Sequence, residues 1–159
     1  MAASGVRASG PFPALELADP DGAPRPLAEA WRDGQALVLI GHRDCPTTRL
    51  ALPFFERIHR RRTRGTALLV LQDDAATVRT LRAELELTVP TRLEPPPYAL
   101  AAQLHVRAVP TLLLIDTKGR IRRVCEGFDR RALESLAGEL GVAGALFAPD
   151  DRAPAFRPG

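Results

Sequence analysis

The sequence predicts an α/β fold: a mixed, largely parallel central sheet with helices on both faces and a hairpin added at the N-terminal side. Three apolar runs of strand length carry this prediction: Ala36–Ile40, Thr66–Leu71 and Thr111–Ile115. Helix-like segments separate the first two runs, and a turn at 117–120 lets Ile121–Glu126 pair back on the third run as an antiparallel strand.

Several helices are expected between and after these strands. The helix from Pro46 to about Arg62 starts with a proline, which suits a first turn, and Pro53 is expected to kink it. Asp73-Asp74 can cap a second helix that runs to about Leu87. The remaining expected elements are strands at 12–17 and 89–93, one helical turn at 27–31, and helices at 98–104 and 130–140.

The chain divides into one domain and two tails. Residues 1–11 are rich in Ala, Ser and Gly and are expected to form a flexible tail. Residues 12–140 form the expected domain, which opens with a hairpin around the turn Asp19–Gly22. Residues 141–159 are rich in Pro and Ala, and are expected to lie along the surface or to be mobile.

Composition limits the function classes. The 159 residues include 45% hydrophobic and 26% charged residues, enough for one folded domain. Two cysteines exclude a disulfide scaffold, and three scattered histidines give no metal site. The basic run at 59–64 is interpreted as a solvated helix end, so no nucleic-acid partner is expected. No signal peptide or run of about 20 apolar residues is present, which favours a cytoplasmic protein without membrane contact.

Cys45 is the strongest candidate for chemistry. It follows a buried strand and a short loop and precedes a helix, whose N-terminal N–H groups and partial positive charge favour a thiolate. His42 and Arg43 could assist, whereas Asp44 would oppose. The alternative is that Cys45 is a small buried hydrophobe.

A second feature is Pro110, directly before a buried strand. A proline there cannot donate a hydrogen bond into the sheet. A cis Val109–Pro110 bond would end the loop tightly and expose backbone near the Cys45 loop, but an ordinary trans proline is equally compatible with the sequence.

These features together resemble thioredoxin. The shared pattern is Cys45-Pro46 at a helix start, a proline eight residues later, and Val109-Pro110-Thr111 before a strand. The chain length, the N-terminal hairpin and the stretches at 52–57, 72–74, 97–98 and 118–128 resemble the TlpA-like and AhpC/TSA redoxin branch. The resemblance covers roughly residues 12–140. It implies a thioredoxin-like fold, a redox-active Cys45, and a substrate strand held beside Pro110 through Val109 and Thr111 by β-addition.

Three departures from the family pattern matter. Thr48 stands where the second cysteine of Cys-x-x-Cys would be, so its hydroxyl could only donate a hydrogen bond to Cys45. Leu39 stands where thioredoxin has a buried acid. Val38 and His42 stand where peroxiredoxins carry the proline and threonine that precede their cysteine.

The resulting hypothesis is a monothiol thiol-disulfide oxidoreductase or redoxin. Cys45 would attack protein or small-molecule disulfides, less readily peroxides, and an external thiol such as glutathione or thioredoxin would resolve the product, with no bound cofactor. The alternatives are a redox-inactive peptide- or protein-binding module, and an atypical thiol peroxidase that uses Cys125. The substrate, the reductant and the oligomeric state stay open.

Two other groups are candidates for resolving an intermediate on Cys45. Cys125 falls in the last strand of the expected sheet, where a packed strand cysteine is the plainer interpretation. Some members of the branch continue past a Pro-Gly like Pro158-Gly159 into a Cys-Gly-Ser tail. The sequence ends at Gly159, and the resemblance leaves two interpretations open: the absence of that cysteine, or a reading frame ended at a codon that could encode selenocysteine.

Overall fold

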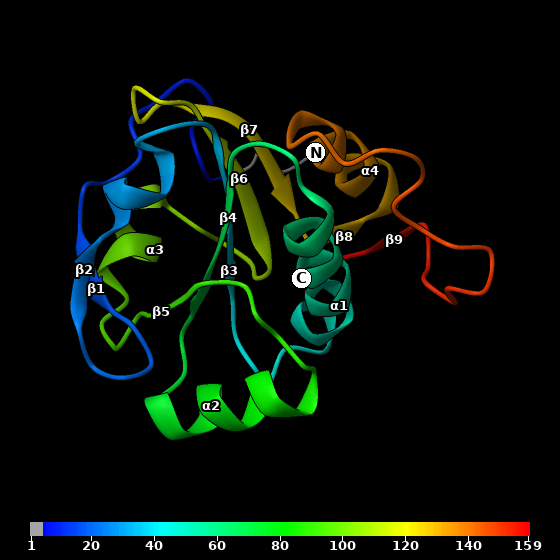
Figure 1. The fold of residues 1–159 in the computed structure, drawn as a ribbon. Helices are drawn as coiled ribbons and strands as arrows, with labels where there is room; N and C mark the ends of the chain where they lie inside the picture. The colour runs from blue at the N-terminus through cyan, green and yellow to red at the C-terminus, as the bar shows by residue number, and fades with distance from the viewer. Residues whose placement is uncertain (1–4) are drawn as a thin grey trace.

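The computed structural model describes residues 5–159 and has a seven-stranded sheet at its centre (Figure 1). The strand order is β2-β1-β5-β4-β3-β6-β7. The strands are β1 Glu16–Ala18, β2 Pro24–Pro26, β3 Ala36–Gly41, β4 Thr66–Leu71, β5 Thr91–Leu93, β6 Thr111–Ile115 and β7 Ile121–Glu126. The helices are the 3-10 helix η1 Leu27–Trp31, α1 Pro46–Arg61, α2 Ala75–Glu84, α3 Ala99–Leu104 and α4 Arg130–Glu139. A second, two-stranded sheet pairs β8 Phe128–Asp129 with β9 Phe156–Arg157.

The mixed sheet and the N-terminal hairpin are confirmed, but the expectation of a largely parallel sheet is wrong. Only the β3–β4 and β4–β5 pairs are parallel, and the other four pairs of the main sheet are antiparallel. The six-residue α3 spans only about 9 Å, so it does not carry the chain back across the sheet. As a result, β6 starts beside the last residues of β3, with Thr111 opposite Ile40.

The core lies in two layers, one on each face of the sheet. Leu37 and Leu39 of β3 pack with α1, α2 and α4, whereas Val38 and Ile40 pack with η1 and α3. Figure 1 shows α1 and α4 on one side of the sheet and α3 on the other. The continuous apolar runs of the sequence therefore reflect strands that are buried on both faces.

The first long helix matches its predicted bounds, and the second is shorter than predicted. Helix α1 runs from Pro46 to Arg61, with Pro53 inside it. Helix α2 ends at Glu84 rather than near Leu87, because Glu86 takes a left-handed backbone conformation with φ of 53°. No helix in residues 5–159 is long and apolar enough to span a membrane.

The two expected tails take more part in the fold than the sequence indicated. Residues 1–4 lie outside the described residues, but Val6 is buried and the backbone N–H of Ser9 donates to Ile121 of β7. On the other side, Leu146 and Phe147 are buried in the same core layer as α1 and α4. Their apolar side chains complete that layer, so the folded unit extends well beyond residue 140.

Candidate active site

Cys45 is the N-cap residue of α1, at the end of the loop that follows β3. Its half-buried Sγ accepts a hydrogen bond from the backbone N–H of Thr48 at 3.5 Å. The same Sγ donates to the carbonyl oxygen of Val109 at 3.2 Å, a contact open only to the protonated thiol. The sulfur therefore lies between the N-terminus of α1 and the loop before β6, the arrangement that the sequence predicted.

Thr48 contacts the sulfur in a different way from the expected one. It offers its backbone N–H to Cys45, while its hydroxyl oxygen accepts from the N–H of His42 at 3.4 Å. The Thr48 side chain is fully buried, and a Cβ on Gly41 would come within 2.6 Å of its methyl group. The Thr48 side chain thus packs between the end of β3 and α1, and its hydroxyl faces the loop at His42.

The candidate assisting residues have other partners. His42 Nδ1 accepts from the backbone N–H of Asp44 at 3.0 Å, and its Nε2 lies 3.8 Å from an Asp73 oxygen. The Arg43 guanidinium pairs with Asp44 at 3.2 Å. Pro46 is exposed at the first position of α1, where its missing N–H leaves no bond unmade. These contacts shape the loop and give neither the His42 nor the Arg43 side chain a bond to the Cys45 sulfur, while the His42 carbonyl accepts from the backbone N–H of Cys45 at 3.1 Å.

The loop before β6 brings Val109 and Pro110 to the sulfur. The Val109–Pro110 bond is cis. Pro110 is buried, and its carbonyl accepts from the N–H of Gly127 at 2.7 Å, which ties this loop to the end of β7. Thr111 was expected to help hold a substrate strand through the backbone beside Pro110; its side chain is fully buried, and its hydroxyl donates to the Ala108 carbonyl at 2.7 Å. Thr111 therefore holds the loop in shape from behind.

Cys125 lies in β7 opposite Leu112 and packs partly against the core layer beneath α1. Burial raises the pKa of its thiol to about 11. At neutral pH its thiolate fraction is therefore very small, and the thiolate is the reactive form. Cys45 and Cys125 are both free thiols.

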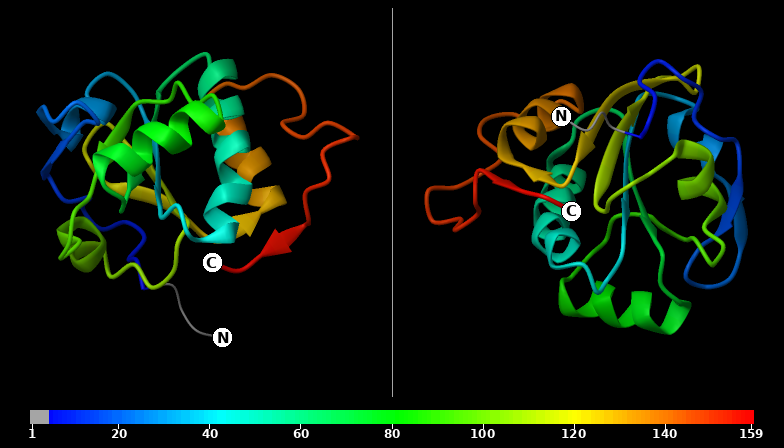
Figure 2. Two further views of the ribbon diagram at one scale, coloured as in Figure 1. Left: turned by 90° about the horizontal axis from the view of Figure 1, so that it is seen from below. Right: turned by 180° about the vertical axis from the view of Figure 1, so that it is seen from behind.

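The segment around Pro158, which the sequence indicated only as the point where some similar chains continue into a cysteine-containing tail, contacts the start of α1. The hydroxyl of Thr47 donates to the Pro158 carbonyl at 2.7 Å, and Thr47 is only 3% exposed. Figure 2 shows this end of the chain beside the start of α1 in both views. The available signal was weak: one apolar pair, Leu146-Phe147, and the short alternation around Phe156 within a Pro/Ala-rich stretch.

The described residues hold no cluster of metal-ligating side chains. Across residues 5–159, no group of three or more His, Cys, Asp or Glu side chains is placed to hold a metal ion. The site is thus defined by one sulfur, the N-terminus of α1 and a backbone carbonyl.

Comparison with known proteins defines the class of fold. No family model and no curated protein sequence matches the chain. Among solved structures, a putative thiol:disulfide interchange protein DsbE from Chlorobium tepidum matches with a TM-score of 0.73 and 17% identity, over 84% of this chain and 95% of that one. A putative protein disulfide isomerase from Bacteroides thetaiotaomicron matches with a TM-score of 0.75 and 19% identity, over 87% and 91%.

A third similar structure is the peroxidoxin BcpB from Mycobacterium tuberculosis, with a TM-score of 0.73 and 18% identity over 88% of this chain and 99% of that one. These likenesses show that the chain has the thioredoxin-like fold that its motifs indicated. The fold is the one used by thiol:disulfide interchange proteins and by a peroxidoxin, the two kinds of protein in the branch that the sequence resembles.

Proposed function

We propose that this protein is a thiol-disulfide oxidoreductase that works through one cysteine, Cys45. The Cys45 thiolate attacks one sulfur of a disulfide, forms a mixed disulfide with that half, and releases the other half as a thiolate. An external thiol then attacks the mixed disulfide, which frees Cys45 and leaves a new disulfide between the external thiol and the bound half. Atoms and electrons balance because one disulfide is consumed and one is formed.

The observation that carries this proposal is the placement of the Cys45 sulfur at the N-terminus of α1 in a thioredoxin-like fold. The N–H of Thr48 points at the sulfur, and the helix dipole adds partial positive charge there. Position 48 offers no second thiol, and the raised pKa of Cys125 makes it a poor internal replacement. An internal dithiol cycle therefore has no second member among the described residues.

The partners follow from the same reasoning. The substrates are small-molecule or protein disulfides, and the resolving agent is an abundant thiol such as glutathione, or a thioredoxin. No bound cofactor is required, because the sulfur carries the exchange itself. A reducing compartment, the cytoplasm, suits a protein with two free thiols.

The test compares Cys45→Ser with Cys125→Ser. With bis(2-hydroxyethyl) disulfide as substrate and glutathione as reductant, Cys45→Ser should reduce turnover to the uncatalysed rate, whereas Cys125→Ser should retain it. Without glutathione, the intact mass should show one adduct on Cys45. Full turnover by Cys45→Ser would end the proposal.

A redox-inactive binding module is the second candidate. The contact that favours it is the hydrogen bond from the Cys45 thiol to Val109, because that contact stabilises the protonated, unreactive form. Alkylation of Cys45 at a series of pH values separates the two functions. If the pH of half-maximal alkylation is lower for Cys45 than for glutathione, the result supports exchange. If the two pH values are similar and no disulfide adduct forms, the result supports the binding module.

The atypical peroxidase is tested by measuring peroxide reduction on the same variants. A Cys45–Cys125 disulfide after one equivalent of peroxide would support it.

A further inference from the structure

The segment Phe156–Gly159, here called the strap, lies against the backbone of the loop before β6, to which a polypeptide substrate would have to bind. Strand β9 pairs with β8, with Phe128 opposite Arg157. Beyond it, the Pro158 carbonyl accepts from the Thr47 hydroxyl at 2.7 Å. Gly159 then lies against Val109, whose carbonyl also accepts from the Cys45 thiol. The strap therefore ends beside the sulfur.

The approach between the strap and the site is closer than most side chains allow. A Cβ on Gly127 would lie 2.6 Å from the Arg157 carbonyl oxygen and 3.2 Å from the Gly159 nitrogen. A Cβ on Gly159 would overlap the carbonyl of Val109. Glycine at both positions lets the strap backbone lie flat on the ends of β7 and of the loop before β6.

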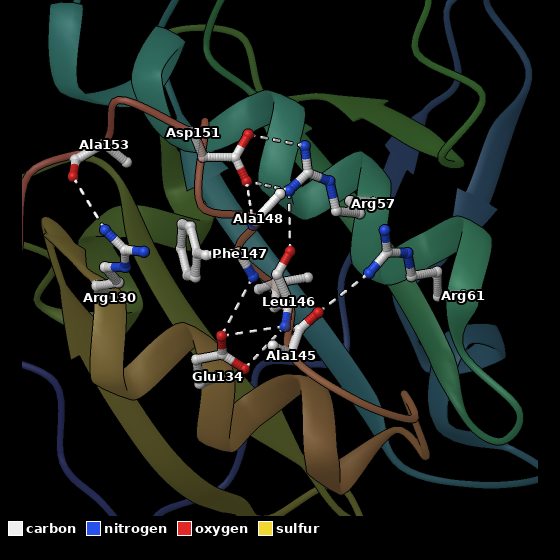
Figure 3. A network of polar contacts seen from close by, with 10 residues as sticks. All are labelled: Arg57, Arg61, Arg130, Glu134, Ala145, Leu146, Phe147, Ala148, Asp151 and Ala153. Carbon is white, nitrogen blue, oxygen red and sulfur yellow. Dashed lines mark hydrogen bonds and ion pairs between the residues drawn. The ribbon is translucent and has the colours of Figure 1, made fainter.

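Residues 145–153, which precede the strap, are held on α1 and α4 by a set of contacts, which Figure 3 shows. Asp151 pairs with Arg57 of α1 through both oxygens, at 2.6 and 3.2 Å, and accepts from the Ala148 N–H at 2.7 Å. The Glu134 carboxylate of α4 accepts from the N–H groups of Leu146 and Phe147. Two further arginine contacts fix the backbone: Arg61 to Ala145 and Arg130 to Ala153.

Packing strengthens this attachment. The Phe147 ring lies 4.5 Å from that of Phe54 in α1 and 6.0 Å from that of Phe128 in β8. The Arg130 guanidinium lies over the outer side of the same ring, 4.7 Å from its centre. Charged and aromatic contacts thus fix residues 145–153 to α1 and α4, and the chain then has only a few residues to reach Cys45.

We infer that the strap sets the substrate class of the site: with the strap in place, Cys45 accepts low-molecular-weight disulfides and excludes polypeptide disulfides. This inference rests on the proposed function. A polypeptide disulfide needs backbone pairing along Val109 to bring its sulfur to Cys45, and Gly159 occupies that edge. A small disulfide needs only access to the half-buried sulfur itself.

The test uses full-length variants that lift the strap. Gly159→Leu places a side chain against the Val109 carbonyl, and Thr47→Val removes the hydroxyl that binds Pro158. Their matched controls are Gly138→Ala, where a Cβ meets no atom within 4 Å, and Thr63→Val, which removes a hydroxyl bond to the Gly141 carbonyl at a distance from the site. Rates of Cys45 adduct formation are measured with bis(2-hydroxyethyl) disulfide and with an unstructured 12-residue peptide disulfide.

The measured quantity is the ratio of the peptide rate to the small-disulfide rate. This ratio should rise about fivefold in Thr47→Val and about tenfold or more in Gly159→Leu, and stay within about twofold in both controls. An unchanged ratio in both strap variants overturns the inference.

A second readout separates this inference from the proposed function. Alkylation of Cys45 by iodoacetamide and by a maleimide on a 5-kDa polymer needs no redox chemistry. If no disulfide reacts in any variant, the proposed function fails, and the polymer-to-iodoacetamide ratio alone decides on the strap. A rise in the polymer-to-iodoacetamide ratio in Gly159→Leu, but not in the control variants, supports the inference that the strap covers the sulfur. No rise in this ratio overturns the inference.

Discussion

Thr48→Cys would supply the second thiol that the site lacks, and its consequences follow from the geometry of α1. The backbone nitrogen of Thr48 lies 3.5 Å from the Cys45 sulfur, and the two residues are three positions apart. Side chains at such positions have Cβ atoms about 5–6 Å apart, and a disulfide needs about 3.5–4.5 Å. Cys45 is an N-cap residue with extended backbone, so a small change there brings the two sulfurs together.

The expected gain is in the release of product. Under the proposed function, only an external thiol breaks the mixed disulfide in the wild type, so turnover should rise in proportion to the glutathione concentration. A neighbouring thiol acts at an effective concentration on the order of 1 mM or more. At about 0.1 mM glutathione, the mixed disulfide should therefore break down about tenfold faster in Thr48→Cys than in the wild type.

The assay follows decay of a preformed adduct on Cys45 by mass spectrometry at several glutathione concentrations. Thr48→Ser is the control, because it keeps a hydroxyl and adds no thiol. The reduced Thr48→Cys protein should lose about 1 kcal/mol or less of unfolding free energy, since the hydrogen bond from His42 is long at 3.4 Å. Equal decay rates in Thr48→Cys and wild type would refute the idea that a missing resolving thiol limits this site.

Three further predictions concern titration and stability. Burial raises the pKa of Cys125 to about 11, so at pH 8 only about one Cys125 thiol in a thousand is ionised, and peptide mapping should find iodoacetamide mainly on Cys45. The pKa of Glu56 is lowered: burial opposes ionisation, but hydrogen bonds outweigh it. Glu56→Gln should thus cost about 2 kcal/mol of unfolding free energy at pH 7, measured by urea titration, and less as the pH falls. Arg57 lowers the pKa of Asp151 to about 2, so this pair stabilises the protein above about pH 4 and its contribution is lost toward pH 2. Asp151→Asn should cost about 1 kcal/mol at pH 7 and remove that step from the acid-unfolding curve.

Much of the sheet could be predicted because its signals are local. Strands β4, β6 and β7 begin and end where the apolar runs and turn residues placed them. Strand direction could not be predicted in the same way. The run Thr111–Ile115 would be buried on both faces whether it paired parallel or antiparallel with β3. Its antiparallel pairing depends on how far the short α3 carries the chain.

The placement of the strap and of the segment before it could not be predicted because their stabilising partners are distant in sequence. Arg57 and Asp151 are 94 residues apart, and Thr47 and Pro158 are 111 apart. No periodicity within residues 141–159 records these contacts. The same limit applies to Thr111: the sequence places it next to Pro110 but does not show that its hydroxyl turns back to Ala108.

The two threonines after Pro46 give a physical meaning to the departure from Cys-x-x-Cys. Thr48 faces inward, where its methyl group packs on Gly41 and its hydroxyl accepts from His42. Thr47 faces the strap and binds the carbonyl of Pro158. A thiol at position 48 would keep neither the loop bond nor the same fit, and an apolar residue at 47 would release the strap. Under the proposed function, position 48 therefore determines the need for an external thiol and position 47 the choice of disulfide, so Thr48→Cys and Thr47→Val should each change one of these two properties.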